Sequence, residues 1–203
     1  MLDSLPEESP KYVVDGKFKD TPSPGMLSDE TLRERVRQYP NVTLIDAPNL
    51  MEHETRNMYL THMKDHKYGF LIDSDEYLES PDWDSVLEIL KPLDTGFMHV
   101  VLEGELHDNT YRTYPRIFIN PKKWEYYKAH FIMRNRETGE IADNIHAKGE
   151  FIDHGILLIR HDKSLRSEEF AKMEDEYKRI LIEYEAPIRK AYKEGDKSLF
   201  SSL

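Results

Sequence analysis

The sequence predicts an α/β protein with three layers, in which helices cover both faces of a mainly parallel sheet and a mixed extension follows. In the first half of the chain, short strand-like runs alternate with helical patterns, which is typical of βαβ units. In the second half, further strand-like runs have no clear helices between them, which indicates a partly antiparallel extension. The length of 203 residues suits one domain with a hydrophobic core.

Three short apolar runs, each ending in an aspartate, are expected to form the parallel strands: 11–15, 42–46 and 69–73. Between the first two, Ser28 is expected to cap a helix whose apolar positions recur at intervals of four and three, namely Leu32, Val36 and Tyr39. Between the second and third runs a similar stripe predicts a second crossover helix, with Met51, Thr55, Met58, Tyr59 and Met63.

The later elements are predicted from the same signals. Ser80 followed by Pro81 predicts a helix start, because proline at the first helical position lacks only an N–H that would be unsatisfied anyway. Further strands are expected at 96–103, 116–120 and 156–160. A docking helix over about 164–186 has one apolar stripe, formed by Phe170, Met173, Tyr177, Ile180, Leu181 and Tyr184. We expect a single domain over 1–187 and a frayed tail over 188–203.

Composition excludes several classes of function. The net charge of -11 opposes nucleic-acid binding, which depends on Lys and Arg neutralising phosphates. The absence of cysteine removes disulfides, thiolate metal sites and cysteine nucleophiles. No apolar run approaches the roughly 20 residues of a membrane helix, and the N-terminus lacks the apolar core of a secretory signal. We therefore expect a cytoplasmic protein without a transmembrane segment.

Aspartates follow all three strands that we expect to be parallel. The carboxyl ends of strands in an open α/β sheet line the crevice where ligands bind, so Asp15, Asp46 and Asp73 are expected at one edge. Aspartate also follows strands as a turn former or helix cap, and for Asp46 alone both interpretations stay open.

The run Asp73-Ser74-Asp75-Glu76 places three acidic side chains within four positions, and a cation or basic partner must offset their repulsion. Oxygen ligands suit Mg²⁺ or Mn²⁺, so a metal site is expected here; the alternative is a solvated acidic turn before the helix near Pro81. His161 ends the apolar run 156–160, and His154 precedes it. Either histidine is a candidate ligand for Mn²⁺ or an ordinary turn residue.

These residues together resemble the family 2-like glycosyltransferases, which have the Rossmann-like GT-A nucleotide-diphosphosugar transferase fold. The resemblance rests on the runs "YVVDGKF...LSDET", "NVTLID...EHETRN" and "YGFLIDSDEYLES". It covers roughly residues 12–184 and is firm as far as Leu78. The matching order consists of Asp15-Gly16, Ser28-Asp29-Glu30-Thr31, Arg56-Asn57 and Asp73-Ser74-Asp75.

The resemblance implies transfer of a sugar from a nucleotide-diphosphate donor to the hydroxyl of a glycan or other acceptor, with inversion. Asp75, and Asp73 directly or through water, would then hold Mn²⁺ or Mg²⁺, with His161 as third ligand and His154 as its competitor. The remaining donor contacts would come from Asp15, Gly16, Asp46, Arg56, Lys163 and Arg166. For Arg56 two roles stay open, contact with phosphate or bracing of the aspartate motif. Glu103, Glu105, Asp108 and His130 are the candidates for the general base, and the resemblance favours His130.

One departure separates this chain from the family pattern. Members begin with a strand and a helix before the Asp-Gly turn, and that strand lines the nucleotide base pocket, whereas about ten residues precede Tyr12 here. Two further functions therefore stay open: a GT-A-like binding module that is truncated or has lost activity, and a metal-dependent phosphoesterase or nucleotidyltransferase.

Overall fold

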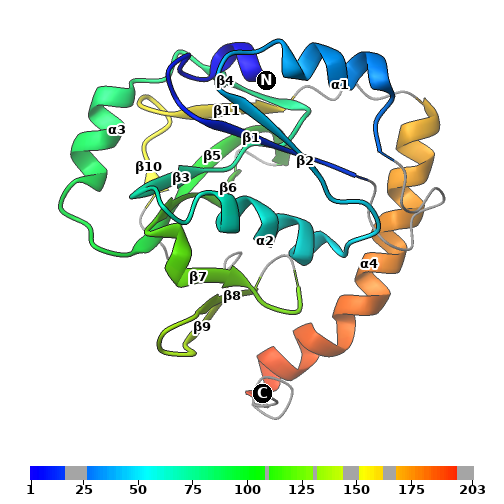
Figure 1. Cartoon of the computed structure of the whole chain (residues 1–203). Helices are drawn as coiled ribbons and strands as arrows, with labels where there is room; N and C mark the ends of the chain where they lie inside the picture. Colours follow the sequence, from blue (N-terminus) through cyan, green and yellow to red (C-terminus); the bar gives the residue numbers. More distant parts are fainter. Residues whose placement is uncertain (17–26, 108–109, 130–131, 144–150, 162–167, 196–203) are drawn as a thin grey trace.

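The computed structural model describes residues 1–16, 27–107, 110–129, 132–143, 151–161 and 168–195, and it has an α/β fold (Figure 1). Strands fall into a two-stranded sheet, a six-stranded sheet that we call the main sheet, and a three-stranded sheet that we call the small sheet. A short 3-10 helix, η1 (Leu2–Ser4), precedes the first strand, and its Ser4 hydroxyl accepts a hydrogen bond from Leu78 N–H in the main sheet.

Strands β1 (Lys11–Asp15) and β2 (Val42–Asp46) form the two-stranded sheet and have the predicted bounds. They run parallel, with Asp15 opposite Asp46, as the sequence predicts. Helix α1 (Glu30–Arg37) is the crossover between them. Its N-cap is Asp29, whose carboxylate accepts a hydrogen bond from Leu32 N–H; the expected cap, Ser28, bonds to Asp15 instead.

The main sheet has the order β3-β6-β5-β11-β4, and β10 also pairs with β5. The bounds of its strands are β3 (Tyr68–Phe70), β4 (Glu76–Glu79), β5 (Gly96–His107), β6 (Thr110–Ile119), β10 (Phe151–Ile152) and β11 (Leu158–His161). Strand β3 pairs antiparallel with β6, and among the described residues of this sheet the parallel ladders are β10–β5 and β11–β5.

The expectation of a mainly parallel sheet is therefore wrong, and the sheet is mixed. Among the described residues the third predicted strand forms no ladder with β1 or β2, and β3 pairs instead with β6, which folds back from β5. Sequence periodicity also missed β4, which begins at Glu76, the last residue of the acidic run. Helix α3 (Trp83–Leu90) starts two residues later than expected, because Asp82 is its N-cap and accepts a hydrogen bond from Ser85 N–H.

The small sheet consists of β7 (Trp124–Tyr126), β8 (Ile132–Asn135) and β9 (Ile141–Asp143), and the turn η2 (Pro121–Lys123) leads into it from the main sheet. Helix α2 (Glu52–His62) lies against β7. The Asn57 side chain fixes this contact, because its amide donates to the Tyr126 carbonyl at 2.8 Å and its oxygen accepts from Tyr126 N–H at 2.7 Å.

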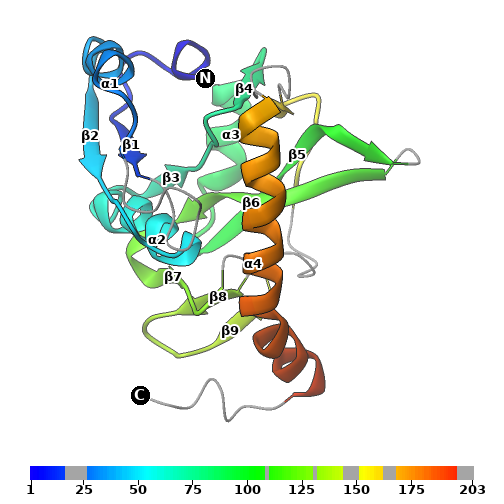
Figure 2. The ribbon, with the colours of Figure 1, turned by 90° about the vertical axis from the view of Figure 1, so that its right-hand side faces the viewer.

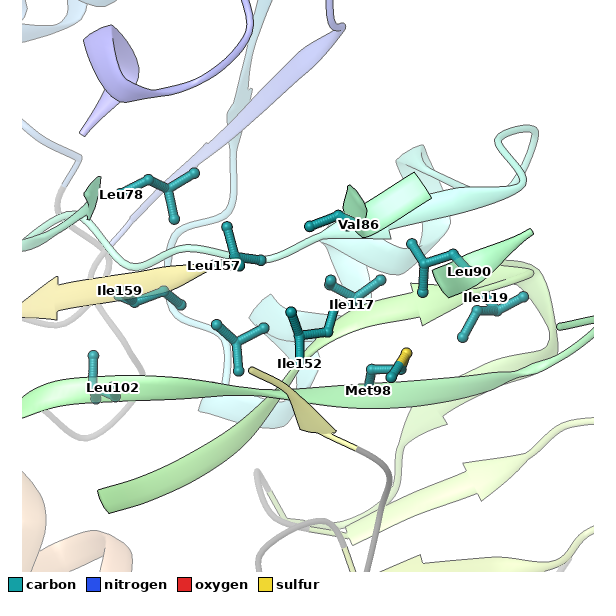
Figure 3. Packing of buried hydrophobic residues seen from close by; sticks show 11 residues of the cluster. Leu78, Val86, Leu90, Met98, Leu102, Ile117, Ile119, Ile152, Leu157 and Ile159 are labelled. Carbon is teal, nitrogen blue, oxygen red and sulfur yellow. The ribbon is translucent and has the colours of Figure 1, made fainter. Parts of the chain in front are cut away.

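The largest hydrophobic cluster lies between α3 and the main sheet (Figure 3). Helix α3 contributes Val86 and Leu90, and the strands contribute side chains that are fully or almost fully buried, among them Val100, Ile117 and Ile159. A second cluster packs α2 onto the other elements through Leu60, Met63, Leu71, Phe118, Trp124, Tyr126 and Met133. The two clusters fix the ends of β3 and β4, which carry the acidic run between them.

Helix α4 (Glu168–Glu194) follows the main sheet and crosses the side of the molecule (Figure 2). It continues eight residues beyond the expected end at Ala186 and passes through Pro187, so residues 188–194 are helical and are not a frayed tail. Ile188 and Ala191 are buried, and their packing explains the extension. Within the described residues, no helix is both long enough and apolar enough to cross a membrane.

Candidate functional site

The acidic residues that the sequence singles out lie in the turn between β3 and β4, residues 73–76, which we call the acidic turn. Two ladders hold its ends. Leu71 N–H donates to the Arg116 carbonyl on β6 at 2.8 Å, which continues the β3–β6 pairing, and Glu76 is paired with His161 in the β4–β11 ladder. The turn therefore connects the two edge strands of the main sheet.

Asp75 and His161 meet at this turn although 86 residues separate them in the sequence. Asp75 Oδ2 lies 2.7 Å from His161 Nε2, and both side chains are largely buried. The register of β11 against β4 creates this contact, because it places His161 opposite the residue that follows Asp75. The contact joins two of the residues predicted as metal ligands.

Asp73 points toward two arginines instead. Arg116 Nη2 lies 3.1 Å from Asp73 Oδ2, and Arg56 Nη1 lies 3.8 Å from Asp73 Oδ1. Burial opposes the charged form, but Arg116 and Arg56 outweigh it and hold the pKa of Asp73 well below its usual range. Its side chain is 40% exposed, so the carboxylate stays open to a ligand on its solvent side.

Arg56 is held on the other side by Glu52, one turn earlier in α2, with Nη2 to Oε1 at 2.9 Å. Its guanidinium also lies 5.8 Å from the centre of the Tyr126 ring, which is a favourable cation–π position. Of the two roles that the sequence left open for Arg56, contact with phosphate or bracing of the aspartates, the position beside Asp73 supports bracing.

Glu76 is the buried acid of the turn, and only 3% of it is exposed. Its Oε1 lies 2.6 Å from Arg116 Nη2, and its Oε2 accepts a hydrogen bond from Asp73 N–H at 2.8 Å. Burial raises the pKa of Glu76 in spite of the opposing charge of Arg116. The three acids of the turn thus have three different environments.

In the described part of the chain, four carboxyl groups and two guanidinium groups gather around the acidic turn: those of Glu52, Asp73, Asp75, Glu76, Arg56 and Arg116. The turn is therefore rich in carboxylate oxygens, which are the kind of ligand that Mg²⁺ and Mn²⁺ take in proteins.

The donor atoms fit a cation that shares its coordination with a ligand. Asp75 and His161 offer one oxygen and one nitrogen donor, a combination that suits Mn²⁺. No group of three or more His, Asp or Glu side chains in the described part of the chain could form a complete cation site. Phosphate oxygens and water would have to supply the remaining ligands, as is usual for Mg²⁺ in nucleotide sites.

Asp15 and Asp46 belong to a separate arrangement around Arg33 of α1. The guanidinium of Arg33 pairs with Asp15 and, at 2.6 Å, with Asp46, and the attraction of these carboxylates raises the pKa of Arg33. Asp15 also accepts hydrogen bonds from Ser28 N–H at 3.1 Å and from the Ser28 hydroxyl at 2.7 Å. The main present role of Asp15 is to hold the start of α1 against β1.

Gly16 follows Asp15 where the chain passes very close to β2. A Cβ atom at this position would lie 2.3 Å from the Ala47 carbonyl oxygen, and the φ of +157° also favours glycine. The Asp-Gly pair is thus explained by backbone packing, independently of any ligand.

Of the other predicted site residues, the structure describes the side chain of His154 but not those of the remaining candidates. His154 lies in an exposed turn beside Asp153, so His161 is the histidine that reaches Asp75. Glu103 and Glu105 lie on β5, in a part of the strand whose side chains are outside the described set. Asp108, His130, Lys163 and Arg166 are outside the described residues.

Sequence reasoning singled out Arg56 but missed two other basic partners of the acids, Arg116 and Arg33. Arg116 is a single charged residue in the otherwise apolar end of β6, and a buried charge normally has a partner, so its position carried a usable signal. Glu52 is spaced four residues before Arg56, which is also a readable pair. Arg33 had no such signal, because its partners are on two separate strands.

Comparison of the sequence with protein-family models and with curated proteins finds no match in either.

Proposed function

We propose that this protein is a metal-dependent glycosyltransferase that moves a sugar from a nucleotide-diphosphate donor to an acceptor hydroxyl, with inversion, on a GT-A-type fold. The observation that carries the proposal is the meeting of Asp75 and His161 at 2.7 Å beside Asp73. The sequence resemblance expects this constellation, which unites an early acidic motif with a late histidine. The carboxylate oxygens gathered in the same cluster support a cation at this place.

In this proposal Asp75 and His161 hold Mn²⁺ or Mg²⁺ together with the diphosphate of the donor. When bound, the cation offsets the negative charge that develops on the leaving nucleoside diphosphate. Asp73 has a different task. Arg116 and Arg56 fix its carboxylate, and its exposed side accepts hydrogen bonds from the donor or from water on the cation.

The direct test is a titration of the protein with Mn²⁺ in the presence of UDP or GDP. The electron paramagnetic resonance signal of free Mn²⁺ measures how much of the ion is bound. Asp75→Ala and His161→Ala should each weaken the affinity for Mn²⁺ by at least about tenfold. In the double variant the loss of affinity should be smaller than the product of the two single losses, because both residues bind the same ion. Glu88→Ala removes an exposed acid from α3 and should leave the affinity unchanged.

Three outcomes decide between the functions. Equal binding by Asp75→Ala and the unmodified protein contradicts the proposal. One Mn²⁺ per chain agrees with it, whereas two ions at close range favour a phosphoesterase or nucleotidyltransferase.

A second candidate is a GT-A-like module that binds a nucleotide without transferring sugar. The engagement of Asp15 and Asp46 by Arg33 favours this candidate, because both aspartates were expected to contact the donor. Hydrolysis of a UDP or GDP sugar by the unmodified protein, lost in Asp75→Ala, would exclude it.

A further inference from the structure

Glu76 is the acid of the acidic turn that the proposed function does not use, yet it bonds to the backbone of the turn itself. Its carboxylate accepts from Asp73 N–H at 2.8 Å, and its own N–H donates to the Asp73 carbonyl at 3.1 Å. Both polar backbone groups of Asp73 are thus bound by one residue. The shape of the turn therefore depends on where the Glu76 side chain is held.

Arg116 holds that side chain. It lies on β6 beside the end of β3, it is 4% exposed, and its Nη2 contacts Glu76 Oε1 at 2.6 Å and Asp73 Oδ2 at 3.1 Å. The backbone of Arg116 also takes part, because its carbonyl accepts from Leu71 N–H just before the turn. One residue of β6 therefore fixes the turn through both its main chain and its side chain.

A buried ion pair seldom adds stability beyond that of well-packed apolar side chains of the same volume, because removing two charges from water is costly. The pair at the base of the turn therefore has its main effect on geometry. We propose that Glu76 and Arg116 are a positioning pair, which sets the direction of the Asp73 and Asp75 carboxylates toward the nucleotide-bound cation. This inference rests on the proposed function and extends it to two residues that do not touch the ligand.

Three variants separate positioning from stability. Glu76→Gln keeps an oxygen for Asp73 N–H and removes the charge that holds Arg116. The double variant Glu76→Leu with Arg116→Met removes both charges and leaves apolar volume in their place. The matched control is Glu79→Gln on the same strand, which breaks the pair between Glu79 and Arg160 at 2.7 Å without a contact to the turn. Circular dichroism and thermal unfolding confirm that each variant is folded.

The first readout needs no ligand and is the hydrogen exchange of the Asp73 backbone amide, measured by NMR and compared with core amides of β5. We expect the exchange rate to be at least about tenfold higher in the double variant, because the amide loses the carboxylate of Glu76 as its acceptor. We expect no change in Glu79→Gln. An unchanged rate in the folded double variant would overturn the positioning pair.

The second readout is the affinity for Mn²⁺ with UDP or GDP as the probe. Glu76→Gln should weaken it by at least about tenfold while Glu79→Gln should not, and this result supports the inference. Undiminished affinity in Glu76→Gln would refute the claim that the pair orients the carboxylates for the cation. If the unmodified protein binds neither Mn²⁺–UDP nor Mn²⁺–GDP, the proposed function fails, and the amide exchange rate still decides whether the pair fixes the turn.

Discussion

Tyr59 is a partly buried phenol on α2 near the acidic turn. Burial and the negative charge of Asp73 raise the pKa of Tyr59 to about 12, although Arg56 and Arg116 oppose the shift. Below pH 10 the phenol is protonated in both the folded and the unfolded chain. Between pH 10 and 12 the unfolded chain loses this proton and the folded chain keeps it, so the free energy of unfolding falls, by at most about 3 kcal/mol.

This alkaline effect is testable with Tyr59→Phe, which removes the titrating group. The free energy of unfolding of the variant should decline less between pH 9 and pH 11.5 than that of the unmodified protein, as measured by urea unfolding. Tyr77→Phe, which removes an exposed phenol, is the control. The same decline in both variants would show that Tyr59 does not carry the effect.

At the residue scale, the sequence identified the acids more readily than their partners. An acidic run after an apolar strand is visible in the sequence, and so is a histidine at the end of a later strand. Which oxygen meets which arginine depends on strand register, which links positions such as Asp73 and Arg116 across 43 residues. Local patterns contain no information on that register, so the division of the turn into three environments was not predictable.

Helix α4 gives a prediction at the scale of an element. Ile188 is 8% exposed and packs with Tyr127, Ala129 and Ile132 of the small-sheet region, whereas Ile182 on the same helix is 64% exposed. Ile188→Ala should lower the free energy of unfolding by about 2–4 kcal/mol, because it leaves a cavity in this cluster. Ile182→Ala should change it by less than about 0.5 kcal/mol.

Urea unfolding of the two variants checks this prediction under identical conditions. A small effect of Ile188→Ala, similar to that of Ile182→Ala, would mean that the part of α4 after Pro187 does not pack against the body of the protein as the burial of Ile188 indicates.

The accuracy of the sequence prediction differed between elements for a physical reason. Strands β1 and β2 were predicted to the residue, because turn-forming residues flank short β-branched runs. Strand β4 was missed, because it is only four residues long, has an acid at each end and begins at the last residue of the acidic run. The end of α4 was set by tertiary packing of Ile188 and Ala191, which outweighed the helix-breaking tendency of Pro187.

At the scale of the whole molecule, the β1–β2 pair and the main sheet differ in how firmly they are held. Strand β5 has ladders with β6, β10 and β11, while β1 and β2 have a ladder only with each other in the described part of the chain. Amides of β1 and β2 should therefore exchange with solvent at least about tenfold faster than those of β5 residues 97–102.

Hydrogen exchange resolved to single amides measures this difference at a pH where the native protein is stable. Equal protection of the two groups of amides would indicate that the β1–β2 pair and the main sheet open as one cooperative unit.

The isolation of the β1–β2 pair also affects how the protein behaves at high concentration. Along one edge of each of these two strands, the described residues provide no ladder partner. The backbone N–H and C=O groups of such an edge can pair with a strand from another molecule. Both strands are only five residues long, and the charged group of Asp15, Asp46 and Arg33 at their ends disfavours stacking of copies. Substitutions that neutralise these three charges should therefore increase aggregation at high protein concentration.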